Sequence, residues 1–229
     1  MTNGIAISRL HFPVTTLGPG RRIGIWFQGC SIRCSGCISK DTWDPDQGWT
    51  TVDSVIAAVQ HWMPDAQGIT ISGGEPFDQP DALRVLLQKL RGISGGDVLV
   101  YSGYLFDELT EWLDANSGLV DVLISGPYQE RSGQSFRLRG SDNQALHFLT
   151  ELGRERFSSF DRTIQPEDRR FDVMFDDNGS VWIAGIPHRD DFRRFKSILK
   201  AAGHSGCFSD SHTTEVPLDS ILPQLSDRT

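Results

Sequence analysis

Three of the four cysteines in this chain lie close together, at Cys30, Cys34 and Cys37, in the spacing C-x3-C-x2-C. They follow residues 23–27, an apolar stretch that predicts a buried strand. Three thiolates at this spacing suit three corners of one iron–sulfur cubane, because cysteine thiolates are the usual iron ligands in such clusters. Three protein ligands leave the fourth iron open, and a substrate group can then coordinate it.

Three other interpretations of the cysteines stay open. A structural zinc site needs four ligands, with His204 or Cys207 completing the set. Such zinc sites usually contain two C-x2-C motifs, and this sequence has only one, formed by Cys34 and Cys37. A closed electron-transfer cluster would instead take Cys207 as its fourth ligand. Unliganded core cysteines are the third possibility, although three thiols in a polar loop pack poorly.

Composition limits the class of protein. The 229 residues, 38% hydrophobic and 23% charged, suit one globular domain or a domain with a small appendage. The net charge of −8 argues against a nucleic-acid partner, and we expect pairs such as Arg21-Arg22 to be solvated. Without an apolar run of signal-peptide or membrane-span length, the sequence predicts a cytoplasmic protein with no membrane partner.

Strand-like and helix-like segments alternate over about the first 125 residues. The expected strands are 5–12, 23–27, 68–72, 98–101 and 119–124, and the expected helices are 51–62, 80–90 and 104–113. This alternation predicts an α/β fold whose parallel strands are joined by right-handed crossovers. Ligands bind such sheets at the carboxyl ends of the strands, where the sequence places Cys30, Gly73, Ser102 and Gly126.

The remainder of the chain is less regular. Residues 127–144 are polar and glycine-rich and predict a loop, and 146–152 carry a weak helical pattern. Segments 171–175 and 181–186 flank Asp177-Asn178-Gly179, which predicts a β-hairpin. A helix is expected over 190–202, ended by Gly203, and a short helix with a disordered end from Thr213. We therefore expect a core, 1–145, and a C-terminal extension, 146–229.

The residues from Cys30 to Cys37 resemble the C-x3-C-x-φ-C signature of the radical S-adenosylmethionine superfamily. Gly36 replaces the usual aromatic, as in the activating proteins of anaerobic ribonucleotide reductase. Further motifs similar to that family follow in order over about residues 5–145: GPGRR (18–22), WFQGC (26–30), DTW (41–43), SGGEP (72–76), VYSGY (100–104), DVLISGP (121–127) and LRGSDNQ (138–144).

The resemblance implies a partial (β/α) barrel of the radical S-adenosylmethionine type with mostly parallel strands, plus the C-terminal hairpin and helix. It also implies two cofactors: a [4Fe–4S] cluster on Cys30, Cys34 and Cys37, and S-adenosylmethionine. The segment Gly73, Gly74, Glu75 and Pro76 would receive the methionyl amino group, with Gly36, Ile38, Ser39 and Ser102 as further cofactor-binding positions. Independently, a Gly-Gly turn lets backbone approach a ligand closely, although an ordinary strand-to-helix turn also fits.

The implied activity is reductive cleavage of S-adenosylmethionine to methionine and a 5′-deoxyadenosyl radical, with the electron supplied by a flavodoxin- or ferredoxin-like donor. No catalytic residue beyond the cluster ligands is expected. The leading substrate is the glycine Cα–H of a glycyl-radical enzyme, such as an anaerobic ribonucleotide reductase. The alternatives are another peptide or small molecule or, in a different class, an electron carrier or regulatory module. Two departures from the family weaken the leading choice: Leu17 replaces a frequent aspartate, and 146–229 exceed the compact activating protein.

Overall fold

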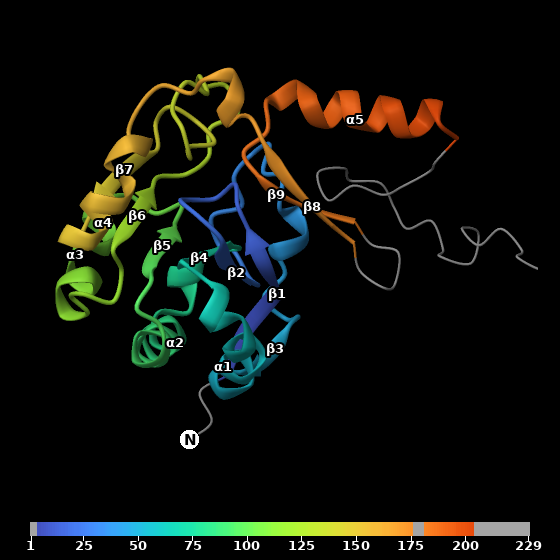
Figure 1. The fold of residues 1–229 in the computed structure, drawn as a ribbon. Helices are drawn as coiled ribbons and strands as arrows, with labels where there is room; N and C mark the ends of the chain where they lie inside the picture. The colour runs from blue at the N-terminus through green and yellow to red at the C-terminus, as the bar shows by residue number, and fades with distance from the viewer. Residues whose placement is uncertain (1–3, 176–180, 204–229) are drawn as a thin grey trace, which may run out of the picture.

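The computed structural model describes residues 4–175 and 181–203, which form a seven-stranded sheet covered on both faces (Figure 1). The strand order is β3-β1-β2-β4-β5-β6-β7. These strands are β1 (Gly4–Val14), β2 (Arg22–Phe27), β3 (Trp49–Thr51), β4 (Gly68–Gly73), β5 (Asp97–Tyr101), β6 (Val122–Ser125) and β7 (Ala145–Phe148). Helices and strands share one core, so the expected α/β class is confirmed.

Strand direction differs between the centre and the edges of the sheet. The central strands β2, β4, β5 and β6 run parallel to one another. Strand β1 pairs antiparallel with both β2 and β3, and β7 pairs antiparallel with β6. Antiparallel neighbours need only short connections, such as the one between β1 and β2. The sheet is therefore mixed rather than mostly parallel, and β3 and β7 do not pair to close a barrel.

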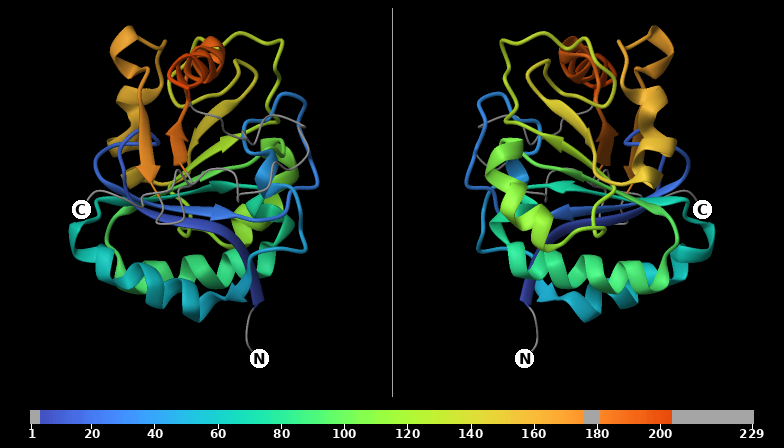
Figure 2. Two further views of the ribbon diagram at one scale, coloured as in Figure 1. Left: turned by 90° about the vertical axis from the view of Figure 1, so that its right-hand side faces the viewer. Right: turned by 90° about the vertical axis from the view of Figure 1, so that its left-hand side faces the viewer.

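Three helices cover one face of the sheet: α1 (Val52–Val59), α2 (Pro80–Ile93) and α3 (Phe106–Ala115) (Figure 2). Thr51 caps α1, because its hydroxyl accepts the Ser54 N–H at 3.1 Å. Helix α2 buries the apolar stripe that its sequence period predicts, namely Leu83, Leu86, Leu87 and Leu90. None of the helices in 4–175 and 181–203 has the length and apolar character needed to cross a bilayer.

The opposite face carries α4 (Glu151–Phe157) and a second apolar cluster. Side chains of a strand alternate between faces, so Val98 and Val100 of β5 meet the helical layer while Leu99 meets Phe157 and Phe160. Short 3₁₀ helices complete the regular structure of the described residues: Lys40–Thr42, Gln60–Asp65, Pro76–Asp78, Ser158–Phe160 and Pro166–Asp168.

The expected helix over 146–152 is wrong. Residues Ala145–Phe148 form β7, and α4 begins only after Thr150, whose hydroxyl accepts the Gly153 N–H at 3.1 Å. Pairing with β6 overrides the weak local preference for helix. The division of the chain after residue 145 stays a prediction, and β7 spans that boundary.

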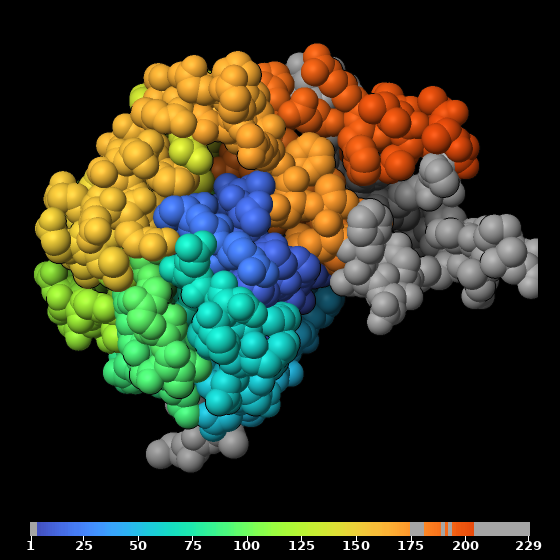
Figure 3. All heavy atoms as spheres, in the orientation of Figure 1, coloured from blue at the N-terminus to red at the C-terminus, as the bar shows by residue number. Residues whose placement is uncertain are grey.

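The expected hairpin and terminal helix are present as β8 (Phe171–Phe175), β9 (Val181–Gly185) and α5 (Arg189–Ala201). Met174 and Ala184 pack on Val14 and Leu17, at the start of the chain. Figure 3 shows the hairpin, in orange, against this blue N-terminal part. The predicted turn at 177–179, the tail from Thr213, His204 and Cys207 lie outside the described residues.

Arg22 corrects the expectation of a solvated arginine pair. Its side chain is fully buried, and its guanidinium lies 2.6 Å from the Asp97 carboxylate. The same guanidinium donates to the Thr70 hydroxyl at 2.6 Å and to the Ile69 carbonyl at 2.7 Å. A buried charge is tolerated when it is paired and hydrogen-bonded in this way, and here the pair joins β2 to β4 and β5.

Candidate functional site

The carboxyl ends of β2, β4 and β5 open into one cavity of about 370 Å³. This volume lies in the range of small-molecule sites, and the position is where parallel sheets bind ligands. The predicted site residues that line it are Cys30, Cys34, Gly36, Cys37, Ile38, Ser39, Gly73, Gly74, Glu75 and Ser102. Pro76 is buried and does not line the cavity, although it begins the 3₁₀ helix that follows Glu75.

The three thiols form one wall of the cavity and are each partly buried. Burial raises the pKa of each thiol above its ordinary value, and neighbouring backbone N–H groups oppose the shift. For example, the Ser39 N–H donates to Cys37 Sγ at 3.4 Å. All three cysteines line the same cavity.

The chemistry of this wall suits an iron–sulfur cluster, because three cysteine thiolates can each bind a separate iron of one cubane. Backbone N–H donors beside the sulfurs are also the hydrogen bonds that such clusters use. The three cysteines therefore fit three corners of a [4Fe–4S] cluster.

The diglycine turn positions the cluster loop. Gly73 has a φ of +104°, and a Cβ there would lie 2.5 Å from the Phe27 backbone nitrogen. A Cβ on Gly74 would lie 2.1 Å from the Gly29 carbonyl oxygen. The Gly74 N–H donates to the Phe27 carbonyl and the Glu75 N–H to the Gly29 carbonyl, both at 2.8 Å. Glycine is required at both positions because the turn packs on the backbone that leads into Cys30.

Glu75 joins the ends of β4 and β5 beneath the cavity. Only 1% of its surface is exposed. Its carboxylate accepts the Ser102 hydroxyl at 2.9 Å and the N–H groups of Gly103 at 2.7 Å and Phe77 at 3.0 Å. Burial raises the pKa of Glu75 to about 7, although these hydrogen bonds favour the charged form. Ser102 also accepts the Tyr104 N–H at 3.1 Å, so its hydroxyl is occupied within the protein.

Sequence analysis missed Asp78 and Gln28, which hold both ends of the cluster loop. The Asp78 carboxylate accepts the Ser31 N–H at 2.6 Å, the Ser31 hydroxyl at 2.8 Å and the Tyr104 hydroxyl at 2.8 Å. The Gln28 amide donates to the carbonyls of Asp41 at 3.1 Å and Asp44 at 2.8 Å. Gln28 lies within the WFQGC motif and Asp78 lies two positions after SGGEP, and this placement is the signal that would have found them.

Gly36 occupies a tight position under the loop that follows β6. Its φ is +75°, and a Cβ there would lie 2.7 Å from the Glu130 carboxyl carbon. Tyr128, in the same loop, presents its backbone N–H to Cys34. Tyr128 and Glu130 of this loop therefore lie against the cluster wall, which we define as residues 30–39, 73–75 and 102–103.

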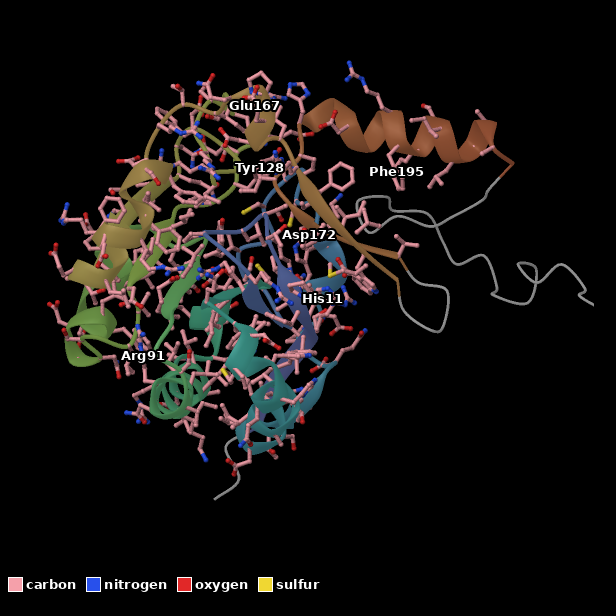
Figure 4. The ribbon with its side chains drawn as sticks, in the orientation of Figure 1. His11, Arg91, Tyr128, Glu167, Asp172 and Phe195 are labelled. Carbon is pink, nitrogen blue, oxygen red and sulfur yellow. The ribbon has the colours of Figure 1, made fainter. Side chains whose placement is uncertain are left out.

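The other side of the cavity is built by residues of the C-terminal extension. We call Ile183, Gly185, Ile186 and Pro187 the hairpin wall, and all four line the cavity. Asp172 of β8 anchors it, accepting both the N–H and the hydroxyl of Thr15 at 2.7 Å (Figure 4). The same carboxylate accepts the N–H and hydroxyl of Thr16 at 3.2 and 3.0 Å. The site thus combines two regions that are far apart in the chain.

Comparison with known proteins assigns the part of the chain that contains the cluster wall to a family. The model of the 4Fe-4S single cluster domain matches residues 16–147. The anaerobic ribonucleoside-triphosphate reductase-activating protein of Escherichia coli K12 is 34% identical over 149 residues, covering 61% of this chain and 96% of that protein. Its counterpart in Vibrio cholerae is 29% identical over 150 residues, covering 61% and 96%.

The counterpart in Enterobacteria phage T4 is 30% identical over 139 residues, covering 58% of this chain and 88% of that protein. Among solved structures, QueE from Escherichia coli matches with a TM-score of 0.38 and 20% identity, covering 44% of this chain and 53% of QueE. That structural likeness is too limited to bear on function. The resemblance to the activating proteins is confirmed: this chain belongs to the 4Fe-4S single-cluster family that includes them, and residues 148–229 extend beyond the matched region.

Proposed function

We propose that this protein is a radical S-adenosylmethionine enzyme whose cluster is held by Cys30, Cys34 and Cys37. With S-adenosylmethionine bound at its open iron, the reduced cluster would supply the electron that yields methionine and a 5′-deoxyadenosyl radical. The observation that carries this proposal is the cavity itself, in which three thiols and the diglycine turn share one wall. The family match to a 4Fe-4S domain supports the iron–sulfur part independently.

The protein's own residues would bind and orient the cofactors. Asp78 fixes the residue after Cys30, and the diglycine turn fixes the backbone before it. We propose that the segment Gly73 to Pro76 receives the methionyl end, with Gly36, Ile38, Ser39 and Ser102 lining the remaining path. Because the Ser102 hydroxyl already bonds Glu75, its contact with a ligand would be indirect or through backbone. We also propose that the sheet corresponds to the partial (β/α) barrel that the resemblance to the radical S-adenosylmethionine superfamily implies.

For the substrate, we propose the glycine Cα–H of a glycyl-radical enzyme, with an anaerobic ribonucleotide reductase as the leading partner. The support is that the relatives are named as activating proteins of an anaerobic ribonucleoside-triphosphate reductase. The electron would come from a flavodoxin- or ferredoxin-like protein, and we place both encounters in the cytoplasm. Clustered thiols stay reduced in that compartment.

A second candidate, modification of a different peptide or small molecule, is favoured by the hairpin wall. Its residues line the cavity but lie beyond the 16–147 region that matches the family. A cavity built partly by an extension that the compact activating proteins lack can select a different substrate, because specificity depends on the side chains that line the site.

Anaerobic reconstitution with iron and sulfide tests the shared chemistry first. We expect the reconstituted, reduced protein to convert S-adenosylmethionine to 5′-deoxyadenosine. Formation of a bound cluster without any 5′-deoxyadenosine would instead support an electron carrier. Co-incubation with the anaerobic ribonucleotide reductase of the same organism then separates the two substrates. A glycyl radical detected by electron paramagnetic resonance supports the activating role, and 5′-deoxyadenosine formation without that radical favours the second candidate.

A further inference from the structure

Ser31, Asp78 and Tyr104 form a hydrogen-bonded group that we call the outer clamp. The Asp78 Oδ2 accepts the Ser31 N–H at 2.6 Å, and its Oδ1 accepts the hydroxyls of Ser31 and Tyr104, both at 2.8 Å. Ser31 directly follows Cys30 in the chain. None of the three is among the described residues that line the cavity. The clamp therefore holds the start of the cluster loop from outside the cavity in which we propose that S-adenosylmethionine binds.

The carboxylate of Asp78 is held by neutral groups alone. Its donors are one backbone N–H and two hydroxyls. Within residues 4–175 and 181–203, no described cation forms an ion pair with it. Arg33, the cation within the cluster loop, donates instead to the Cys30 carbonyl at 3.4 Å. The clamp thus keeps a negative charge next to the residue that follows Cys30, and no paired cation cancels it.

This charge acts on the Cys30 sulfur. Burial raises the pKa of the Cys30 thiol, and the carboxylates of Glu75 and Asp78 act in the same direction, because a negative charge opposes a negative sulfur. An electron added to a cluster held by Cys30 would meet the same repulsion. Net charge is one of the properties that set the reduction potential of an iron–sulfur cluster. Negative charge beside the cluster loop therefore makes the reduced cluster a stronger electron donor.

We propose that Asp78 is a positioning residue that lowers the reduction potential of the cluster while it holds the Cys30 end of the loop in place. It acts through Ser31 and Cys30 rather than by contact with a substrate. The inference rests on the iron–sulfur part of the proposed function and deepens it, since reductive cleavage of a sulfonium requires a strong one-electron donor. It depends neither on bound S-adenosylmethionine nor on the identity of the substrate.

Redox titration of the reconstituted full-length protein, without S-adenosylmethionine, tests this role. The electron paramagnetic resonance signal of the reduced cluster, followed against the solution potential, gives the midpoint potential. Asp78→Asn removes the charge and keeps a side-chain oxygen that can accept the Ser31 N–H. We expect the midpoint potential to rise, because the reduction equilibrium should change about two- to tenfold, which is about 18–59 mV for one electron.

Two matched variants separate charge from structure. Asp81→Asn removes the same charge three positions away, from a side chain that is 96% exposed and pairs with Arg84 rather than with the loop, and its midpoint should stay at the wild-type value. Tyr104→Phe removes one bond to Asp78 and no charge, so its midpoint should move by less than half as much as that of Asp78→Asn. Added salt should shrink the difference between wild type and Asp78→Asn, since salt screens an exposed charge.

An unchanged or lower midpoint in Asp78→Asn, or an equal rise in Tyr104→Phe, would overturn the electrostatic role. If Asp78→Asn retains too little iron for titration, Asp78→Glu and Asp78→Gln give the same comparison with a charged and a neutral side chain of equal length. Loss of the cluster from both neutral variants would also overturn the proposal, and would leave Asp78 with a structural role only.

The outcome is separable from that of the proposed function. A raised midpoint in Asp78→Asn, in a protein whose wild type forms no 5′-deoxyadenosine, would overturn the radical chemistry and leave the role of Asp78 standing. Formation of 5′-deoxyadenosine with equal midpoints in the two proteins would overturn the role of Asp78 alone.

Discussion

The cluster wall and the hairpin wall face the same cavity but are held in place by different interactions. The cluster wall depends on backbone bonds, such as Glu75 N–H to Gly29 carbonyl, and on the buried carboxylate of Glu75. The hairpin wall depends on a small apolar cluster and on the partly exposed Asp172. The cluster wall is therefore positioned by the strands of the sheet. The hairpin wall, which we propose selects the substrate, is instead held by contacts of the C-terminal extension with the sheet.

The largest effect is expected at the cluster ligands. Cys30→Ala, Cys34→Ala and Cys37→Ala should each abolish cluster binding, lowering bound iron and 5′-deoxyadenosine formation by at least about 100-fold, since even outer-shell changes reduce metal affinity 10–100-fold. Iron analysis and the visible absorbance of the reconstituted protein measure this. Cys207→Ala is the control and should retain the cluster. Loss of the cluster in that control would show that Cys207 is a fourth ligand.

A glycine substitution tests how firmly the sheet fixes the cluster wall. Gly74→Ala would place a Cβ against the Gly29 carbonyl and push the cluster loop aside. We expect a loss of about 3–4 kcal/mol in the free energy of unfolding of the cluster-free protein, measured by chemical denaturation.

Gly95→Ala is the matched control for that substitution, because no atom lies within 4 Å of its added Cβ. Its free energy of unfolding should stay within about 1 kcal/mol of the wild type. Similar stabilities for the two variants would mean that the turn yields easily and that the cluster wall is no more rigid than the hairpin wall.

Glu75 should make the stability of the cluster wall depend on pH. Burial raises the pKa of Glu75 from 4.5 to about 7, so the folded state binds a proton that the unfolded state has already lost in this interval. Stability is therefore highest at low pH and falls as pH rises from about 4.5 to about 7, by about 2–3 kcal/mol.

Denaturation of wild type and Glu75→Gln at several pH values isolates this contribution, since other titrating groups are common to both proteins. The difference in stability between the two should change over that interval and level off above about pH 7. A difference that is constant with pH would show that Glu75 stays charged, held so by the hydrogen bonds from Ser102 and Gly103.

Local pattern predicted most elements, because it reports which face of an element is buried. The helix expected over 80–90, which is α2, and the two strands of the hairpin were confirmed in this way. Pattern failed where a distant partner decides the outcome. Ala145–Phe148 became a strand through pairing with β6, and Arg22 became buried through Asp97, which is 75 positions away.

The same limit applies to the candidate site. The strand-end rule brought the cysteines, Gly73, Glu75 and Ser102 to one cavity, because parallel strands end at one edge of a sheet. The role of Asp172 could not be found from sequence, because its partners Thr15 and Thr16 lie 157 and 156 positions away in the chain. The sequence explained the two glycines of the turn only by close approach of the backbone to a ligand. The structure adds a second reason, because the turn also packs directly on the backbone of Phe27 to Gly29.

The smallest effect is expected at the hairpin wall. Asp172→Ala removes the acceptor for the bonds from Thr15 and Thr16, and the partly exposed position limits the loss to about 1 kcal/mol in the free energy of unfolding. Asp65→Ala, at an exposed aspartate, is the control and should change nothing measurable. Bound iron should remain at the wild-type level in both variants, because Asp172 makes no contact with the cluster wall through these bonds. Loss of iron in Asp172→Ala would mean that the two walls form one cooperative unit, and that the extension supports the chemistry as well as the choice of substrate.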